Sequence, residues 1–179
     1  VDREQKLKSE AISRVVDALK KFQNEINKYE VKQVMITGTS ALRDVKNSDQ
    51  LLKKVKNISG VELKIIDGIK EAQLVYQGVS LDLSWEKFII IDIGGGSTEF
   101  IWRDKNNHIK YESLNLGAVR MTERNISSPS LPLPKQEYKN ISGEVKDLIQ
   151  KKLPDFVEQY RQYRMIGVGG TITSLGAIS

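Results

Sequence analysis

The sequence contains no cysteine, a single histidine and no apolar run approaching the length of a membrane span. Without cysteine the chain can form neither a disulfide nor a thiolate metal site, which is typical of proteins from reducing compartments. A membrane span needs about 20 consecutive apolar residues, and the N-terminal residues also lack the apolar core of a secretory signal. We therefore expect a cytoplasmic protein with no membrane partner.

The single histidine, His108, follows the polar turn Lys105–Asn107. A histidine among such neighbours is expected to face solvent. This position argues against mechanisms that need a Ser-His pair or a histidine metal ligand.

The chain has little excess of charge of either sign: 28 basic and 23 acidic residues give a net charge of +5 over 179 residues. Lysines on solvated helix faces account for this excess, so we expect no nucleic-acid partner, although the same excess would attract a polyanion. An apolar content of 39% is ordinary for a folded protein and is enough for one sizeable core or two small lobes.

The stretch Phe88–Trp102 carries the strongest chemical signal. Phe88–Ile91 is a short, β-branched apolar run that predicts a buried strand, and Phe100–Trp102 resumes this pattern after the glycines. Gly94–Gly96 can take positive φ and let backbone N–H groups converge on an anion. The hydroxyls of Ser97 and Thr98 would add donors. The stretch predicts a phosphate-binding loop between two strands.

Two common glycine motifs do not fit this loop. A Walker A loop needs a lysine after its last glycine, where Ser97 stands, and a dinucleotide fingerprint needs a glycine where Glu99 stands. A plain glycine-rich hairpin turn is the alternative. The acids at the two ends, Asp92 and Glu99, favour phosphate chemistry, because a magnesium-assisted reaction needs carboxylate ligands and a means of holding water.

Elsewhere the periodicity alternates between helix and strand, which predicts an α/β fold. Helical patterns cover 9–29, 48–58, 69–79, 117–124 and 135–163, the last broken near Pro154. Strand patterns cover 31–37, 61–67, 108–116 and 165–168. The proline-rich segment Ser127–Pro134 predicts a loop.

Two charged residues follow predicted strand ends, where ligands bind in open α/β sheets. Arg43 is a candidate phosphate clamp, and an ion pair with Asp44 is the alternative. Glu71 lies in the first turn of a predicted helix. It is either a residue that favours the helix start or a carboxylate that aligns an attacking water.

The end of the chain repeats the pattern of strand and glycine turn. Met165–Val168 leads into Gly169 and Gly170, and the helix that begins at Thr171 would direct its N–H groups toward the turn. This is a second candidate anion site.

Five ordered blocks together resemble one family, the exopolyphosphatases and guanosine pentaphosphate phosphohydrolases. They are GTSALRDVKN (Gly38–Asn47), IDGIKEAQLVYQGV (Ile66–Val79), FIIIDIGGGSTEF (Phe88–Phe100), NLGAVRMTE (Asn115–Glu123) and GVGGTITSLGAI (Gly167–Ile178). The DIGGGSTE block occurs more loosely across the actin, sugar-kinase and heat-shock ATPase superfamily, and the IDGIKEA block narrows the resemblance to the phosphatases.

The resemblance implies an α/β fold of ribonuclease-H-like (actin-like) lobes with mixed sheets flanked by helices. Residues 1–84 would belong to the first lobe and 85–179 to the second. It also implies hydrolysis of terminal phosphoanhydride bonds in polyphosphate or guanosine pentaphosphate, giving guanosine tetraphosphate in the latter case, with Mg²⁺ as cofactor.

The resemblance also implies roles for individual residues. Glu71 would be the catalytic base or water-orienting group, and Asp92 and Glu99 would lie near the metal. The phosphate-binding residues would be Arg43, Gly94, Gly95, Gly96, Ser97, Thr98, Gly169, Gly170 and Thr171.

Two departures from the family pattern stand out. Lys70 occupies the position of an acid in the family's G-x-E-E-A block. The family's opening phosphate loop has no counterpart here, so we expect the chain to be a middle portion of both lobes with little turnover alone. A kinase of the same superfamily and a non-catalytic polyphosphate or alarmone-binding module are the alternatives, and a homodimer is compatible with the sequence.

Overall fold

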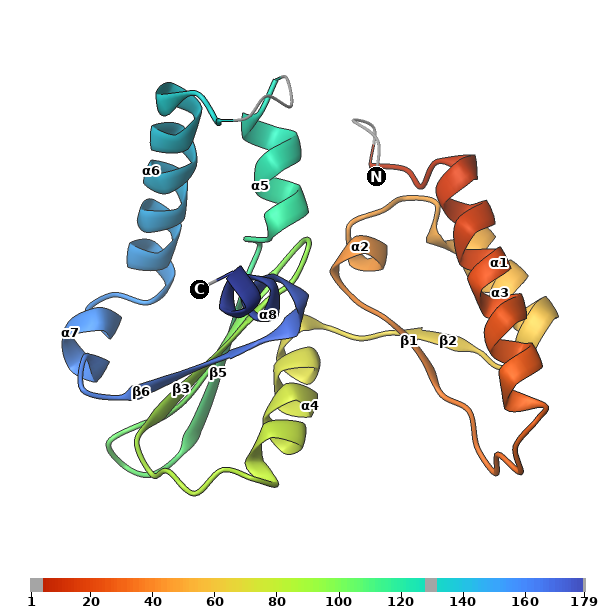
Figure 1. The fold of residues 1–179 in the computed structure, drawn as a ribbon, viewed down its shortest axis with the longest axis horizontal. Coiled ribbons are helices and arrows are strands. Elements are labelled where there is room, and N and C mark those ends of the chain that lie inside the picture. Colours follow the sequence, from red (N-terminus) through yellow and green to blue (C-terminus); the bar gives the residue numbers. More distant parts are fainter. Residues whose placement is uncertain (1–4, 128–131, 179) are drawn as a thin grey trace. The chain divides into compact units, whose positions relative to one another are not determined.

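The computed structural model describes residues 5–127 and 132–178 and divides the chain into two compact units, Val1–Asp67 and Gly68–Ser179 (Figure 1). Half of the predicted loop Ser127–Pro134, residues 128–131, lies outside the described residues. Within the described residues, no helix has both the length and the apolar character that crossing a membrane requires.

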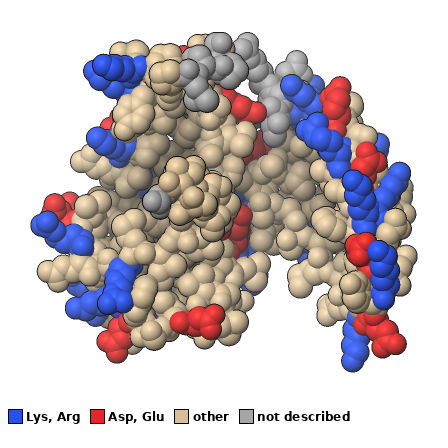
Figure 2. Space-filling view, in the orientation of Figure 1, with Lys and Arg blue, Asp and Glu red and all other residues tan. Residues whose placement is uncertain are grey.

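The first unit packs helices against a small parallel sheet. Its elements are α1 (Ser9–Ile26), β1 (Ile36–Gly38), α2 (Ser40–Arg43), α3 (Ser48–Ser59) and β2 (Leu63–Ile65). The apolar stripe of α1 meets α3 in a core centred on Ile12, Leu51 and Val55. Charged side chains of both signs lie along the outer face of α1, as expected for a solvated lysine-rich helix (Figure 2).

The predicted helices and strands of this unit are present, but the strands are shorter than predicted. Pairing is limited to Ile36–Gly38 against Leu63–Ile65, so the flanking β-branched residues have no partner strand among the described residues. Gly60, at φ +70°, ends α3. Asn47 precedes α3 but does not cap it, because its amide bonds both the N–H and the carbonyl of Leu7 instead, at 2.7 and 3.1 Å.

The second unit contains a four-stranded mixed sheet in the order β5-β4-β3-β6. Its strands are β3 (Phe88–Ile93), β4 (Thr98–Arg103), β5 (Ile109–Leu114) and β6 (Arg164–Val168). Its helices are α4 (Gly68–Ser80), α5 (Ala118–Asn125), α6 (Lys135–Lys152), α7 (Phe156–Tyr160) and α8 (Gly169–Ile178). Neighbours in the sheet are antiparallel except β3 and β6, which run parallel.

Alternate residues of β3 point to opposite faces of the sheet, and each face has its own helices (Figure 1). Phe88 and Ile90 are fully buried under α4, together with Ala72. Ile89 points to the other face, into a cluster that includes Met121 of α5 and residues of α6 and α7. Because Asp92 follows Phe88 and Ile90 at the same spacing of two, its side chain lies on the α4 face.

The compact units divide at Asp67, earlier than the boundary at 84 and 85 that the sequence suggests. The reason is the packing of α4, whose Tyr76 stacks on Phe88 at 6.2 Å between ring centroids, and whose Ala72 is fully buried on the sheet. The assignment of 1–84 and 85–179 to two actin-like lobes stays a prediction.

Candidate active site

The glycines Gly94–Gly96 connect β3 to β4 in a tight hairpin, as predicted. The Gly94 N–H donates to the Ser97 carbonyl at 3.0 Å and closes the turn. The amide of Gly94 is therefore used within the loop, and an anion would have to bind to the amides that follow it.

The start of α5 holds the carbonyl groups of this turn. The N–H groups of Ala118 and Arg120 donate to the carbonyls of Gly94 and Gly95 at 3.0 and 2.9 Å. The Arg120 Nε–H donates to the Gly96 carbonyl at 2.6 Å. The first N–H groups of a helix have no acceptor within the helix itself. In α5, those of Ala118 and Arg120 donate to the glycine turn instead.

This contact fixes the direction of the amides. A trans peptide places each N–H opposite the carbonyl of the preceding residue, so the N–H groups of Gly95, Gly96 and Ser97 are turned away from α5. Neither Gly95 nor Gly96 donates its N–H to an acceptor in the part of the chain that the structure describes. These amides form the outline of an anion cradle.

The two hydroxyls after the glycines serve the loop itself. Ser97 and Thr98 are 3% and 5% exposed. The Ser97 hydroxyl donates to the Glu99 carboxylate, and the Thr98 hydroxyl donates to the Leu116 carbonyl at 2.8 Å. Their hydroxyls therefore bond within the protein, whereas the sequence suggested that these hydroxyls would meet a phosphate.

Carboxylates gather at the same end of the hairpin. Asp92 and Glu99 are directly opposite in the β3–β4 register, and Glu71 comes from the first turn of α4. The backbone of Gly68, which begins α4, lies against Ser113 and close to Glu99. A side chain at Gly68 would collide with Ser113, so glycine lets the start of α4 approach the sheet.

Burial and like charges shift the pKa values of two of these acids. The pKa of Asp92 is raised, mainly by burial and further by the charge of Glu71. The pKa of Glu99, which is 1% exposed, is also raised by burial, and the Ser113 and Ser97 hydroxyls oppose that effect. The Ser113 hydroxyl donates to Glu99 Oε1 at 2.8 Å. The site therefore concentrates negative charge that a cation would relieve.

The glycine turn Gly169–Gly170 lies against Asp92. Gly169, at φ +82°, begins α8 directly after β6, and a Cβ on it would collide with the Asp92 carboxylate. The Thr173 and Ser174 hydroxyls donate to the carbonyls of Gly169 and Gly170 at 3.0 and 2.7 Å. The turn Gly169–Gly170 thus lines the same sheet edge, and Thr171 follows it in the first turn of α8.

Arg43 belongs to the first unit. At the end of α2 its Nη1 donates to the Ile66 carbonyl at 2.8 Å, just past β2. This bond anchors the guanidinium at a strand end, as the sequence suggested, and its role as a phosphate clamp stays a proposal.

A family model described as the Ppx/GppA phosphatase family matches residues 1–179. The chain belongs to this family. The resemblance inferred from the five sequence blocks is thereby confirmed.

Similar proteins and structures agree with this membership. A bifunctional 3-dehydroquinate synthase/phosphatase of Fusobacterium nucleatum is 35% identical over 97% of the chain and 27% of its own length. A guanosine-5'-triphosphate,3'-diphosphate pyrophosphatase of Photobacterium profundum is 32% identical over 96% of the chain and 34% of its own length. The crystal structure of an exopolyphosphatase from Cytophaga hutchinsonii superposes with a TM-score of 0.86 at 29% identity, over 98% of the chain and 56% of that structure.

The chain therefore spans about half the length of these family structures and about a third or less of the curated relatives. A second family structure, an exopolyphosphatase-like protein, also gives a TM-score of 0.86 over 99% of the chain. The predicted fold class, α/β with helices on mixed sheets in a partial chain, is confirmed.

The family's divalent metal was predicted at Asp92 and Glu99. Among residues 5–127 and 132–178, no group of three histidine, cysteine or acidic residues is arranged to hold a metal ion. Mg²⁺ commonly uses one or two carboxylates and keeps several waters, so such a group is not required. Asp92, half-buried and beside Glu71, fits that donor set, whereas Glu99 is almost fully buried and already accepts two hydroxyl hydrogen bonds.

Sequence reasoning missed the residues that shape the turn from outside. Arg120, Ser113 and Gly117 contact the loop or Glu99, yet no spacing in the sequence connects them to it. The family block Asn115–Glu123 pointed to this segment without giving its role.

We expect Arg120→Met to lower kcat/KM for polyphosphate in the full-length protein by about tenfold. Methionine keeps the apolar stem but loses the hydrogen bond to the Gly96 carbonyl, and a bond from a charged donor is worth about 1.5–3 kcal/mol. Arg124→Met, one turn further along α5, is the matched control. Arg124 pairs with Glu144 at the surface, so that loss should leave the rate unchanged. Equal rates for Arg120→Met and wild type would show that the turn does not need this bond.

We expect Glu99→Gln to stabilise the fold near neutral pH. The pKa of Glu99 is raised from 4.5 in the folded state, so the folded wild type loses stability as pH rises above 4.5 and the buried group ionises. Glutamine carries no charge, so its advantage should be absent below pH 4.5 and reach a few degrees in Tm at neutral pH. Thermal unfolding at several pH values measures this difference.

Glu62→Gln provides a control of opposite sign. Hydrogen bonding and charge from Lys56 lower the pKa of Glu62, so its contribution to stability is present above its ordinary pKa and is lost as pH falls. The Glu62→Gln protein should be slightly less stable than wild type at neutral pH. A destabilised Glu99→Gln protein at neutral pH would mean that the two hydroxyls stabilise the carboxylate more than burial opposes it.

Proposed function

We propose that the protein carrying this chain hydrolyses terminal phosphoanhydride bonds, releasing phosphate from inorganic polyphosphate or from guanosine pentaphosphate. The observation that carries the proposal is the glycine turn held by α5, whose outward amides lie at the end of the hairpin where Asp92, Glu99 and Glu71 interact. Membership of the phosphatase family supports it.

Phosphoryl transfer to water requires stabilised charge on the transferred group and a water in line with the leaving oxygen. In this proposal the amides of Gly95, Gly96 and Ser97 bind phosphoryl oxygens. Such donors are already oriented before the reaction and stabilise developing charge without rearrangement. The turn Gly169–Thr171, which lies against Asp92, would line the same site. Arg43 stays a candidate phosphate-binding residue, as the family resemblance implies.

We assign to Glu71 the role of orienting or deprotonating the attacking water. Glu71 is half-buried and comes from the start of α4, close enough to influence the charges of Asp92 and Glu99. Its carboxylate accepts a proton from water or orients it toward the terminal phosphorus.

Asp92 would hold a divalent cation such as Mg²⁺. When bound, that cation supplies neutralising charge to the phosphoryl oxygens. The Asp92 carboxylate is half-buried, and its pKa is raised by burial and by the charge of Glu71. A cation at this position would therefore also offset the repulsion between Asp92 and Glu71.

Phosphate release from the full-length protein tests the proposal. Linear polyphosphate and guanosine pentaphosphate are supplied in parallel with Mg²⁺, and a chelator arm removes the metal. We expect release from at least one substrate and its loss on chelation. Binding without release would instead support the non-catalytic module, and transfer from ATP to an added acceptor in place of release would support the kinase.

A further inference from the structure

A cavity lies at the end of the β3–β4 hairpin opposite the glycine turn. Its volume is about 580 Å³, within the range of about 300–1,000 Å³ typical of small-molecule sites. Its walls are the residues before β3, the β4–β5 turn and the segment from α7 to β6. Because β3 has six residues at about 3.3 Å each, this cavity lies about 20 Å along the sheet from the glycine turn.

Four basic side chains line the cavity: Lys87, Arg103, Lys105 and Arg161. In the part of the chain that the structure describes, the side chains of Lys87, Lys105 and Arg161 make no ion pair or hydrogen bond. Figure 2 shows basic and acidic side chains next to each other at this end of the unit, around α7. Cations without internal partners are available to a ligand.

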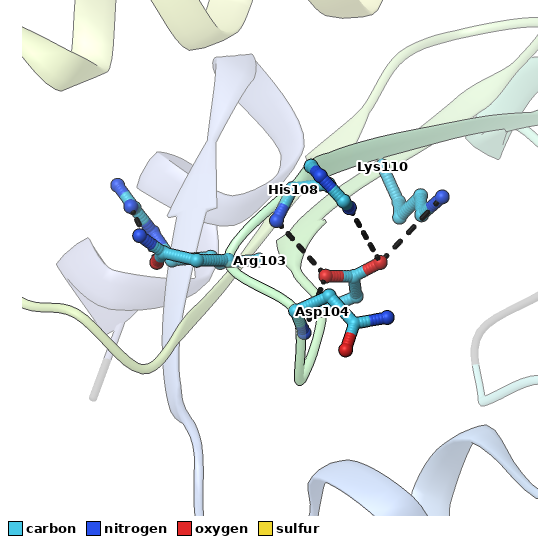
Figure 3. A network of polar contacts seen from close by, with 6 residues as sticks. Arg103, Asp104, His108 and Lys110 are labelled. Carbon is cyan, nitrogen blue, oxygen red and sulfur yellow. Dashed lines mark hydrogen bonds and ion pairs between the residues drawn. The ribbon is translucent and has the colours of Figure 1, made fainter.

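The acids of the cavity do not balance this charge. The lining contains Glu86, Asp104 and Glu158. Asp104 is already occupied, since it accepts the N–H groups of Asn106 and His108 at 2.9 Å each and pairs with Lys110 at 3.5 Å (Figure 3). Two acids then face four basic groups.

Asp104 also makes the turn rigid, which is what a binding site requires. The bonds that it accepts fix the loop backbone, and Asn107 takes a positive φ of 68° within it. The Arg103 Nη1 donates to the Asn107 side chain at 2.8 Å, and its guanidinium lies 5.6 Å from the Phe88 ring centroid. The side chain of Arg103 is thereby held in place.

A buried donor of Arg103, the Nε–H, has no acceptor in the described structure. The edge of a guanidinium formed by Nε and Nη2 is the one that binds an oxyanion with two parallel hydrogen bonds. After a small movement of the guanidinium toward the cavity, an anion oxygen at this edge would satisfy a group that is costly to leave unpaired.

We propose that this cavity is an anion site separate from both glycine turns and that it binds an oligophosphate chain. A ligand with several negative charges matches a fixed guanidinium surrounded by three further cations, whereas a single carboxylate would leave most of that charge unmatched. The site is independent of hydrolysis at the glycine turn. The oligophosphate can come from an inorganic chain or from the phosphates of a nucleotide.

Titration with tripolyphosphate and, separately, with guanosine triphosphate tests the site, with amide NMR shifts as the readout. We expect saturable shifts at Asn106, Asn107 and Gln159, distinct from any at Gly94–Ser97, and weaker binding at higher salt. Equal affinity for both ligands identifies the phosphate chain as the recognised part, and tighter binding of the nucleotide identifies a nucleotide source.

The variant Lys105→Glu/Arg161→Glu should weaken binding at these amides at least tenfold. Lys139→Glu/Lys151→Glu on α6 makes the same change of net charge on exposed lysines away from the cavity, and it should change the affinity less than twofold. Equal weakening by both variants, or the absence of saturable shifts around Asn106, would overturn the proposal. Phosphate release is measured separately, so failure here leaves the hydrolase proposal standing, and the reverse also holds.

Discussion

Glu71→Gln should lower phosphate release by the full-length protein by about 10²–10⁴-fold while substrate binding is retained. Glutamine keeps the size of the side chain and its hydrogen-bonding capacity but cannot take a proton from water. The expected signature is a fall in kcat with KM little changed, measured by phosphate release over a range of polyphosphate concentrations. A wild-type rate would show that Glu71 is not the water-orienting group.

A helix-start role for Glu71 is separated from catalysis by a matched variant. Glu10 also lies in the first turn of a helix, α1, and is exposed. Both Glu10→Gln and Glu71→Gln lose an interaction with the helix dipole that is worth about 0.3–1 kcal/mol. Glu10→Gln should therefore match any small effect on stability and leave the rate unchanged. Similar losses of rate in both variants would favour the structural role.

Gly117→Ala should destabilise the second unit and abolish phosphate binding at the glycine turn. Gly117 is buried, and a Cβ built on it would collide with the peptide that joins Gly95 to Gly96. The obstacle is backbone, which cannot rotate aside as a flexible side chain can. Overpacking of this kind costs about 1–3 kcal/mol and here would displace the amides themselves. Urea unfolding measures the first effect, and amide NMR shifts at Gly94–Ser97 on addition of tripolyphosphate measure the second.

The control for this substitution is Gly143→Ala. Gly143 lies inside α6 and has open space where a Cβ would stand, so alanine should stabilise the helix by roughly 0.5–1 kcal/mol. The backbone of Gly117 is extended, with φ −163°, which any residue adopts, so its need for glycine is one of space alone. A Gly117→Ala protein as stable as wild type would show that the turn can move away from α5.

The local order of elements could be predicted from the sequence because it depends on short-range patterns. The apolar run Phe88–Ile91 and the glycines after it predicted a strand and a turn, and β3 and the hairpin occupy these positions. The prediction of a solvent-facing His108 is also confirmed, since its side chain is 71% exposed beside Asp104. Strand lengths in the first unit were overestimated, since pairing partners decide where a strand ends and periodicity does not.

The direction of the candidate site's chemical groups could not be predicted in the same way. The sequence predicted that the hydroxyls of Ser97 and Thr98 donate to a phosphate, because hydroxyls after a glycine loop often do. In the fold both residues are buried, and their hydroxyls donate to Glu99 and to the Leu116 carbonyl. The Ser97 hydroxyl bonds Glu99, two residues further on, whereas the partner of Thr98, Leu116, lies 18 positions away in the sequence. No local pattern reports such contacts.

The sequence by itself determined which chemistry is available: glycines that free backbone amides, acids on both sides of them, and a family pattern in five ordered blocks that the family match confirms. The tertiary structure alone decided how these groups are used. It placed α5 on the carbonyl side of the turn, brought Glu71 into electrostatic contact with Asp92 and Glu99, and left a cationic cavity at the far end of the hairpin. The physical reason is that residue types fix the capacity to bond, whereas packing between distant segments fixes the direction in which each group points.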